Sequence, residues 1–290
     1  MEEKGYIVSV SLCSEVVIAD DWRRRICEFK GVMETLRLLW LNWRDIKHPW
    51  AGGAEIHLHE IARRLAKDGY DISVLTSHIN NLPAVEWIDG YKVIRIGGHE
   101  TYPYAVWRSL RRFAKDSDMI IEDINKVPIY APLLLRPAKK MLAIVHHLNQ
   151  RIYFDELPLW KASIAYTLET MMPYVYSRVF NVPILAVSDS TRKELLELKA
   201  DPEKVVVIHN GIDHEKYNSG TRDLWKQKQP EPTVVYLGRL KKYKRPHHAL
   251  MAFNLLLRNC PDARLIVVGE GEMLPYLKET VSRLKIPSVH

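Results

Sequence analysis

Two cationic side chains, Arg239 and Lys244, lie five residues apart just after an apolar run that ends at Gly238. The run is typical of a strand and the residues from Pro246 onward are typical of a helix, so both cations are expected where a strand leads into a helix. A guanidinium offers a planar fork of donors, an ammonium is a mobile point charge, and a helix start adds free N–H groups. These groups suit a diphosphate and could stabilise the charge that develops on a diphosphate leaving group. A solvated basic turn would contain the same residues.

Glycine pairs follow two other apolar runs and precede helical stretches. Gly52 and Gly53 are adjacent, whereas Gly269 and Gly271 are separated by one residue. Glycine lets the backbone approach a phosphate closely, and the helix that follows supplies N–H donors. Gly52 and Gly53 belong neither to a Walker loop nor to a complete dinucleotide-binding fingerprint. Tight turns between strand and helix remain an alternative explanation for both pairs.

Other candidate ligand contacts also lie near strand ends. His146 and His147 end one apolar run, and because neighbouring strand residues point to opposite faces, only one of them can face a ligand. A histidine there can donate to a sugar hydroxyl. Trp50 could stack on a sugar ring, Glu55 could accept a hydrogen bond or favour the first turn of its helix, and Asn210 follows another strand. We expect no metal site, since no residue group has the spacing of zinc ligands.

The composition is that of a globular protein, with 290 residues, 47% hydrophobic residues, 27% charged residues and a net charge of +7. The scattered positive charge fits an anionic ligand or an anionic membrane surface better than a nucleic acid. Cys13, Cys27 and Cys260 are too few and too widely spaced for a disulfide framework, which favours a cytoplasmic protein. No apolar run approaches the ~20 residues of a membrane-spanning helix.

Short apolar runs alternate with amphipathic stretches from Leu36 onward, which predicts βαβ units and a mostly parallel sheet. The runs are continuous rather than alternating, so the strands are expected to be covered on both faces. The expected fold class is α/β, with two doubly wound, Rossmann-like domains of which the second is incomplete. The predicted strands span residues 36–43, 71–77, 91–98, 118–123, 140–147, 183–190, 204–211, 233–238 and 263–271.

Helical periodicity predicts a helix over 54–67 that ends at Gly69, and further helices over 105–115, 246–258 and 272–284. Another helix is predicted from Thr191, with Glu194 completing a capping box. The predicted organisation is an extension of unassigned function over 1–34, a first domain over 35–215 on the acceptor side, a linker over 216–232 and a partial second domain over 233–290 that binds the donor nucleotide.

Several motifs in this order resemble the retaining glycosyltransferases of the GT-B fold, glycosyltransferase family 4. They are Gly52-Gly53-Ala54-Glu55, the strand-end His146, VSDSTRKEL from Val187, VIHNGID from Val207, YLGRLKKYKR from Tyr236 and LIVVGEGE from Leu265, and the likeness covers roughly Leu36 to His290. The resemblance implies a nucleotide-sugar donor, a glycan or lipid-linked acceptor and transfer with retention of configuration, without a metal or other cofactor.

Roles for individual residues follow from the same resemblance. Arg239 and Lys244 are expected to hold the donor diphosphate and to act in catalysis, together with His146 at the sugar. Gly52 and Gly53 are expected to contact the same phosphates or the acceptor. Among the other candidates, Gly238, Gly269 and Gly271 belong to the donor side, and Trp50, Glu55 and Asn210 to the acceptor side.

Two features depart from the family pattern. Arg245 stands where the family has a glycine after the motif lysine, and two glutamates eight positions apart, which would contact the donor, do not occur. We therefore expect a chain truncated in its second domain and impaired in turnover. The alternatives are a sugar-nucleotide epimerase or a phosphorylase of the same fold, a non-catalytic remnant or binding module, and, on the basic charge alone, a nucleic-acid binder.

Overall fold

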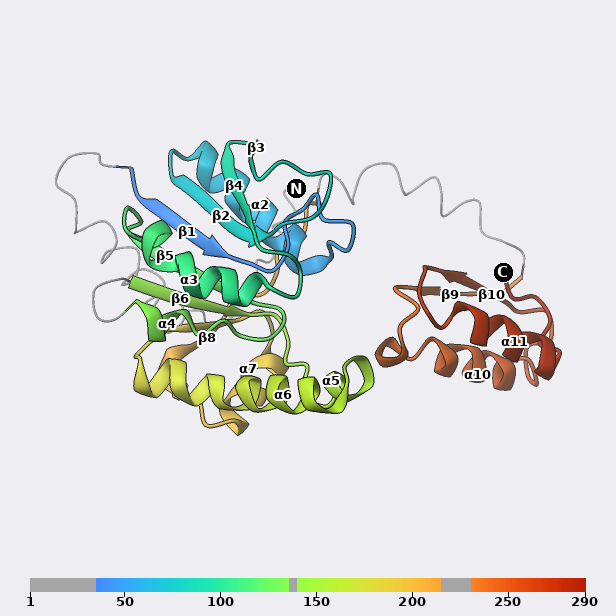
Figure 1. Cartoon of the computed structure of the whole chain (residues 1–290). Coiled ribbons are helices and arrows are strands. Elements are labelled where there is room, and N and C mark those ends of the chain that lie inside the picture. Colours follow the sequence, from blue (N-terminus) through green and yellow to red (C-terminus); the bar gives the residue numbers. More distant parts are fainter. Residues whose placement is uncertain (1–34, 136–139, 215–230) are drawn as a thin grey trace, which may run out of the picture. The chain divides into compact units, whose positions relative to one another are not determined.

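The computed structural model describes residues 35–135, 140–214 and 231–290. It confirms the α/β class and the mostly parallel sheet. An eight-stranded sheet has the order β3-β4-β2-β1-β5-β6-β7-β8, and β9 and β10 form a two-stranded sheet (Figure 1). The predicted extension and most of the predicted linker lie outside the described residues, as do Cys13 and Cys27.

The described residues divide into two compact units: those up to Glu122 together with those between Leu133 and Met141, and all the others. The domain boundaries proposed from the sequence stay predictions. Among the described residues, no helix combines the length and the apolar character needed to cross a bilayer.

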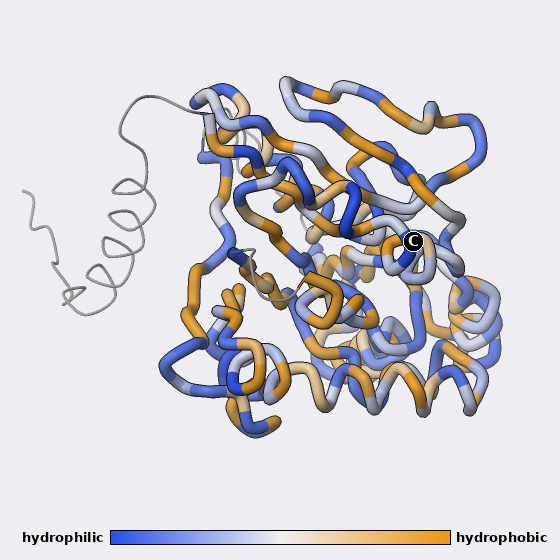
Figure 2. The backbone as a smooth tube through the Cα atoms, turned by 60° about the vertical axis from the view of Figure 1, so that its left-hand side comes forward, coloured by the Kyte–Doolittle hydropathy of each residue, from blue (hydrophilic) through white to orange (hydrophobic). Residues whose placement is uncertain are grey.

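The central strands of the large sheet are buried because their side chains are apolar. β1 (Arg37–Leu41) pairs in parallel with β2 (Asp71–Ser77) and with β5 (Met119–Ile124). Leu39, Trp40 and Leu41 are almost fully buried. Figure 2 shows hydrophobic stretches of the backbone alternating with more hydrophilic ones. The sheet thereby holds the loop after β1 at the carboxyl edge of the strands, where parallel sheets bind ligands.

Two helices of the first unit follow the predicted periodicity. α2 (Gly53–Lys67) buries Leu58 and Ala62, and Gly69, with a φ of 92°, follows its last turn as predicted. α3 (Tyr102–Ala114) begins three residues before the predicted start and buries Val106 and Leu110. Both helices bury an apolar face, and α2 also buries the carboxylate of Glu55 in its first turn.

One strand was missed. β3 (Val85–Ile88) forms an antiparallel hairpin with β4 (Tyr91–Ile96) through Asp89 and Gly90, both of which have positive φ. Aspartate followed by glycine between two apolar runs is a hairpin signal, so the sequence did contain the information.

The remaining strands of the large sheet are shorter than predicted. β6 (Lys140–Val145), β7 (Ile184–Ala186) and β8 (Val205–Val207) are parallel neighbours. The helices of this region are α4 (Ala131–Leu134), α5 (Ile152–Glu156), α6 (Leu159–Tyr174) and α7 (Asp189–Glu197), and a π-helical turn, η1 (Val175–Val179), and a 3-10 turn, η2 (Pro202–Lys204), complete it.

The two-stranded sheet pairs β9 (Thr233–Leu237) and β10 (Arg264–Val268) in parallel, residue for residue. A short 3-10 turn, η4 (Lys242–Lys244), leads into α10 (Pro246–Leu256), and α11 (Leu274–Leu284) follows β10. The elements share a core, whose buried members are Leu240, Leu250, Phe253, Ala263, Leu265, Leu277 and Ile286. This arrangement is the βαβα unit predicted from the sequence.

Candidate active site

The loop between β1 and α2 is held in place by one buried ion pair. Arg44 Nε donates to Glu55 Oε1 at 2.9 Å, and Arg44 Nη1 donates to the carbonyl oxygen of Trp50 at 2.6 Å. The N–H of Gly52 donates to Glu55 Oε2 at 2.6 Å. Glu55 is 1% exposed. Its carboxylate therefore positions the glycine loop, and its burial favours this role over the predicted contact with an acceptor.

The two glycines of this loop are not required by the fold itself. Gly52 is extended, with a φ of −143°, and Gly53 is the first residue of α2. A Cβ added at Gly53 would meet no atom within 4 Å, and one at Gly52 would only touch Glu55 at 3.6 Å. The space in front of both residues is therefore open to a ligand, next to the start of α2, the end of a helix that favours anions.

A second ionic network lies beneath this loop. Asp45 and Arg95 form a bidentate pair, with distances of 2.8 Å and 3.1 Å, and neither side chain is more than 1% exposed. Glu86 accepts from both Arg95 and Lys47, and its pKa is lowered, first by the hydrogen bond from Lys47. Burial disfavours the charged guanidinium, but the hydrogen bonds that Arg95 donates to Asp45 and Glu86, and the charges of these carboxylates, outweigh that effect, so the pKa of Arg95 is raised. Asp45 and Arg95 tie the start of the loop to β4.

Trp50 lies at the open side of the loop, as expected for a residue that stacks on a ligand. Its side chain is 61% exposed, and its ring lies edge-on to His99 at 5.6 Å between centroids. His48 accepts the N–H of Trp50 through Nδ1 at 3.0 Å and packs against both rings. The sequence analysis identified Trp50 but neither histidine. His99 could not be found in this way, because only the tertiary fold brings it to the loop.

His146 and His147 follow β6 and point differently. His146 Nε2 lies 2.9 Å from Asp123 Oδ1, and these side chains are 7% and 0% exposed. His147 is exposed. The structure confirms the strand-end position of both residues. His147 is the more exposed of the two, and the role predicted for His146 at the sugar stays a prediction. His146 is placed to orient the carboxylate of Asp123.

A buried carboxylate shapes the segment after these histidines. Glu169 of α6 is 0% exposed and accepts the N–H groups of Asn149 and Gln150 at 2.8 Å and 2.6 Å. Tyr153 donates its hydroxyl to the same carboxylate at 3.0 Å, and burial, followed by the Glu169 charge, raises the pKa of Tyr153. The sequence analysis missed Glu169, although a single acidic residue within an apolar helix was a usable signal.

The start of α7 differs from the prediction. The helix begins at Asp189, and Ser188 caps it by accepting the N–H of Thr191 at 3.2 Å. Thr191 is thus the third helical residue and not the cap, and Glu194 does not complete a capping box. Thr191 donates its hydroxyl to the carbonyl of His146 at 3.3 Å, which fixes the cap against the end of β6.

Arg239 and Lys244 share one loop with Tyr243 between them. Arg239 Nη2 donates to the Tyr243 hydroxyl at 3.1 Å, and Lys244 Nζ lies 5.3 Å from the centre of the Tyr243 ring. Both cationic side chains are exposed, whereas Leu240 beneath them is fully buried. The loop therefore presents two cations on a common aromatic support, and Tyr243 was not identified from the sequence.

The glycines after β10 allow two backbone segments to pack closely together. A Cβ on Gly269, whose φ is 153°, would lie 1.9 Å from the carbonyl oxygen of Gly238. At Gly271, with a φ of 151°, it would lie 2.5 Å from that of Leu240. These contacts favour the tight-turn explanation for Gly269 and Gly271. The nucleotide contacts predicted for Gly238, Gly269 and Gly271 stay predictions.

Arg245 occupies a conformation that suits glycine. It has a φ of 55° and a ψ of 40° directly before α10. The left-handed region is unfavourable for side chains with a Cβ. This explains in physical terms why the family pattern has glycine here.

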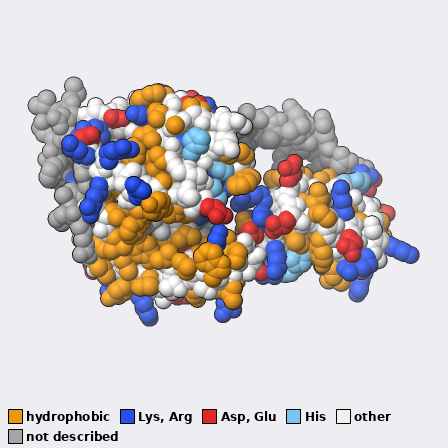
Figure 3. Space-filling model, viewed as in Figure 1, with side chains coloured by type: hydrophobic (Ala, Val, Ile, Leu, Met, Phe, Trp, Pro, Cys, Tyr) orange, Lys and Arg blue, Asp and Glu red, His pale blue; other side chains and the backbone are white. Residues whose placement is uncertain are grey.

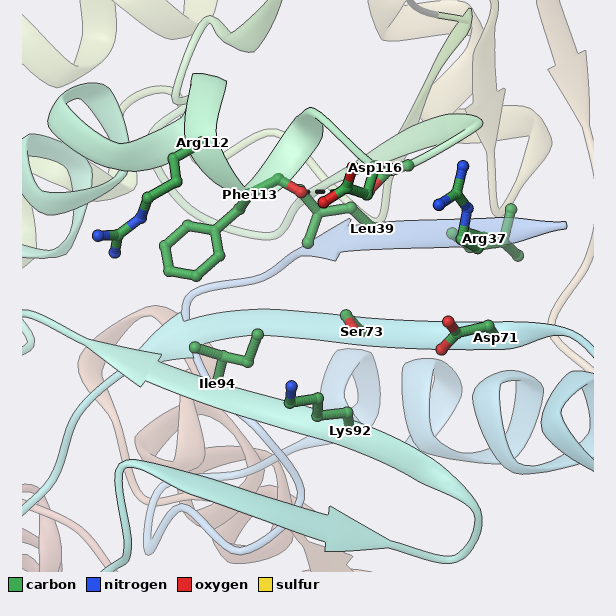
Figure 4. A pocket seen from close by; sticks show the side chains of 11 residues that line it. Arg37, Leu39, Asp71, Ser73, Lys92, Ile94, Arg112, Phe113 and Asp116 are labelled. Carbon is green, nitrogen blue, oxygen red and sulfur yellow. Dashed lines mark hydrogen bonds between the residues drawn. The ribbon is translucent and has the colours of Figure 1, made fainter.

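Two further places complete the comparison with the predicted site. Asn210 is exposed in the segment after β8, and its predicted role stays open. A pocket of the first unit lies at the amino ends of β1, β2 and β4, beside the end of α3 (Figure 4). The residues that line this pocket include Arg37, Asp71 and Arg112. The glycine loop follows the carboxyl end of β1, whereas the pocket lies at the amino ends of the strands, so none of the predicted site residues lines the pocket.

An α/β fold whose parallel strands are joined by helices defines the class of Rossmann-like proteins. The family model described as Glycosyltransferase Family 4 matches residues 51–216, and that of glycosyl transferases group 1 matches residues 221–290. The chain belongs to glycosyltransferase family 4.

Curated relatives are similar over most of this chain. An uncharacterized glycosyltransferase, MJ1607, of Methanocaldococcus jannaschii is 21% identical over 81% of this chain and 63% of its own length. A D-inositol 3-phosphate glycosyltransferase of Corynebacterium aurimucosum is 31% identical over 75% of this chain and 57% of its own. This chain thus spans less than two thirds of the length of these relatives.

Solved structures confirm the fold. Anabaena Alr3699/HepE, in complex with UDP-glucose, superposes with a TM-score of 0.60 and 18% identity over 88% of this chain and 68% of that one. TarM superposes with a TM-score of 0.59 and 9% identity over 89% of this chain and 76% of that one. These similarities support the Rossmann-like GT-B architecture expected from the sequence.

Proposed function

We propose that this protein transfers a sugar from a nucleotide-sugar donor to a glycan or lipid-linked acceptor, with retention of configuration at the anomeric carbon. Family membership supports sugar transfer. The observation that carries the proposal is the pair of exposed cations, Arg239 and Lys244, placed together by Tyr243 on a loop after a strand. HepE, which has this fold, was solved with UDP-glucose, and this supports a nucleoside diphosphate on the donor.

In the proposed reaction the bond between the anomeric carbon and the diphosphate oxygen breaks, and its electron pair leaves with the diphosphate. The acceptor hydroxyl oxygen attacks the anomeric carbon on the same face and forms the new glycosidic bond. The acceptor's proton passes to an oxygen of the leaving diphosphate. Arg239 and Lys244 stabilise the charge gained by that leaving group, and this role needs no metal ion.

Other residues would act by position. The N–H groups at the start of α2, left open in front of Gly52 and Gly53, would contact donor phosphates or the acceptor. Trp50, His48 and His99 would offer an aromatic surface to a sugar ring. His146, whose Nε2 lies against the carboxylate of Asp123, or its exposed neighbour His147 would contact the sugar.

The proposal is tested by turnover with a panel of nucleotide sugars and simple glycoside acceptors, with NMR analysis of the product. Retention predicts that the anomeric configuration of the donor is kept in the product. In a background with measurable turnover, Arg239→Ala with Lys244→Ala should lower kcat by about 10²–10³, because strong contacts to the transition state are lost. An inverted product would refute retention, and an unchanged kcat would refute the role of the two cations.

A further inference from the structure

The carboxylate of Glu169 is buried inside an otherwise apolar helix. The charged residues of α6 are Lys161 and Glu169, and Glu169 is 0% exposed. Figure 3 shows hydrophobic side chains over the region where Figure 1 places α6. In the described part of the chain, every partner of this carboxylate is an uncharged hydrogen-bond donor of residues 149–153. A buried carboxylate without a cation beside it is costly, so its presence calls for a role beyond packing.

The donors belong to the turn that follows the strand-end histidines. Glu169 Oε1 accepts from the N–H of Asn149 at 2.8 Å, from its Nδ2 at 3.2 Å and from the Tyr153 hydroxyl at 3.0 Å. Oε2 accepts from the N–H of Gln150 at 2.6 Å and from its Nε2 at 3.4 Å. Gln150 has a φ of 47°, which is unfavourable for a residue with a Cβ. Such strain persists where the surroundings fix the conformation, and Glu169 fixes this turn between β6 and α5.

Asn149 links this carboxylate to His147. A hydrogen bond joins the side chains of Asn149 and His147. Because a carboxylate only accepts, the Nδ2 of Asn149 faces Glu169, and its Oδ1 is left to accept an imidazole N–H. The other ring nitrogen then keeps its lone pair and can accept from a hydroxyl. Burial of the ring lowers the pKa of His147 more than the bond to Asn149 raises it, which favours the neutral imidazole.

We propose that Glu169 is a positioning residue that acts through Asn149 and holds the imidazole of His147 in one tautomer and orientation, with its lone pair turned toward a hydroxyl of the bound sugar. This inference rests on the proposed sugar transfer, because it assigns that hydroxyl to the transferred sugar. The hydrogen bond orients the sugar and needs no charge on the histidine. If Glu169 only stabilised the packing of α6, an apolar residue would serve as well.

The first test is the tautomer of His147, read from long-range proton–nitrogen NMR correlations of the isotope-labelled chain and assigned by the signals lost in His147→Ala. We expect one dominant tautomer in the wild type. Glu169→Gln turns a donor toward the other donors, and Asn149→Ala removes the link. Both should raise the minor tautomer about tenfold, the effect of losing one hydrogen bond. Met172→Ala is the control, since it removes a buried side chain of the same helix outside this network and should leave the tautomer unchanged.

The second test is turnover in a background with measurable sugar transfer. Glu169→Gln should lower kcat about 10–100-fold with little change in KM, as a loss of positioning does. In a His147→Ala background the same substitution should have no further effect, because it acts through His147.

Three results would overturn the proposal: two tautomers of His147 in the wild type, a wild-type tautomer in both Glu169→Gln and Asn149→Ala, or an undiminished effect of Glu169→Gln on kcat in the His147→Ala background. If no background transfers sugar, the proposed function fails, and the tautomers still decide whether Glu169 positions His147.

Discussion

The glycine pairs at 52–53 and 269–271 look alike in the sequence but differ in the structure. Each follows a strand and precedes a helix. The first pair adopts ordinary backbone geometry and has room for side chains, whereas the second has positive φ and no room for a Cβ. The difference separates two uses of glycine: one leaves space in front of a helix start, and the other lets two backbone segments pack.

The two loops are also held in place by different kinds of contact. Side chains hold the first loop, since Glu55 binds both Arg44 and the N–H of Gly52. Backbone hydrogen bonds hold the second: Gly238 donates to the carbonyl of Val268 at 3.0 Å, and Leu240 donates to that of Glu270 at 2.7 Å. Substitutions can therefore damage the two loops in different ways.

The largest effect on stability is expected for Gly269→Ala. Its methyl group would lie 1.9 Å from a carbonyl oxygen, so the backbone of the two-stranded sheet must move apart. We expect a loss of about 4 kcal/mol or more, or failure to accumulate folded protein. Chemical denaturation measures the loss, and wild-type stability in this variant would show that the loop is not packed as described.

A smaller but substantial loss is expected for Glu55→Ala. The change leaves the largely buried Arg44 and the N–H of Gly52 without this partner, which costs about 3 kcal/mol. Glu55→Gln keeps one acceptor and should recover part of the loss. Denaturation curves for the two variants test whether side chains hold the first loop, and a neutral Glu55→Ala would contradict it.

Gly53→Ala separates binding from folding. Because nothing lies within 4 Å of the added methyl group, stability should be unchanged or raised by up to about 1 kcal/mol, since alanine favours helices. The methyl group would occupy the space proposed for the ligand, so turnover in an active background should fall about 10–100-fold, as when a contact to a reacting phosphate is disturbed. Normal turnover would show that this space is not used.

The smallest effect is expected at Arg245. Arg245→Gly relieves a left-handed conformation and should raise stability by about 0.5–1 kcal/mol, while Arg245→Ala should not. Thermal unfolding of both variants provides the comparison. A destabilised Arg245→Gly would indicate that the arginine side chain contributes contacts that outweigh its backbone strain.

Much of this fold could be predicted from the sequence, because buried parallel strands leave continuous apolar runs. β2 matches its predicted bounds, and α2 and α11 lie within one or two residues of theirs. β3 was missed because it is short and half-exposed, although the dipeptide Asp89-Gly90 is typical of a hairpin turn. The start of α7 was misplaced because Ser188 and Thr191 are equally plausible caps in sequence.

The site was less predictable, since its contacts join distant segments. Glu169 meets Asn149 and Gln150 only through the packing of α6, and Asp123 meets His146 across neighbouring strands. Alternation along a strand showed that only one of His146 and His147 could face a ligand, but not which one. Likewise, sequence alone could not divide the glycine pairs into open and packed ones.

The most direct test of the account is calorimetric titration of the folded chain with UDP, GDP and ADP. We predict that at least one of them binds and that Arg239→Ala with Lys244→Ala weakens its binding about 100-fold, because two charge-assisted contacts to the diphosphate are lost. Lys278→Ala with Arg283→Ala removes the same charge from exposed sites on α11 and should leave binding nearly unchanged. Absence of binding by all three nucleotides, or equal binding by the Arg239/Lys244 variant, would contradict the account.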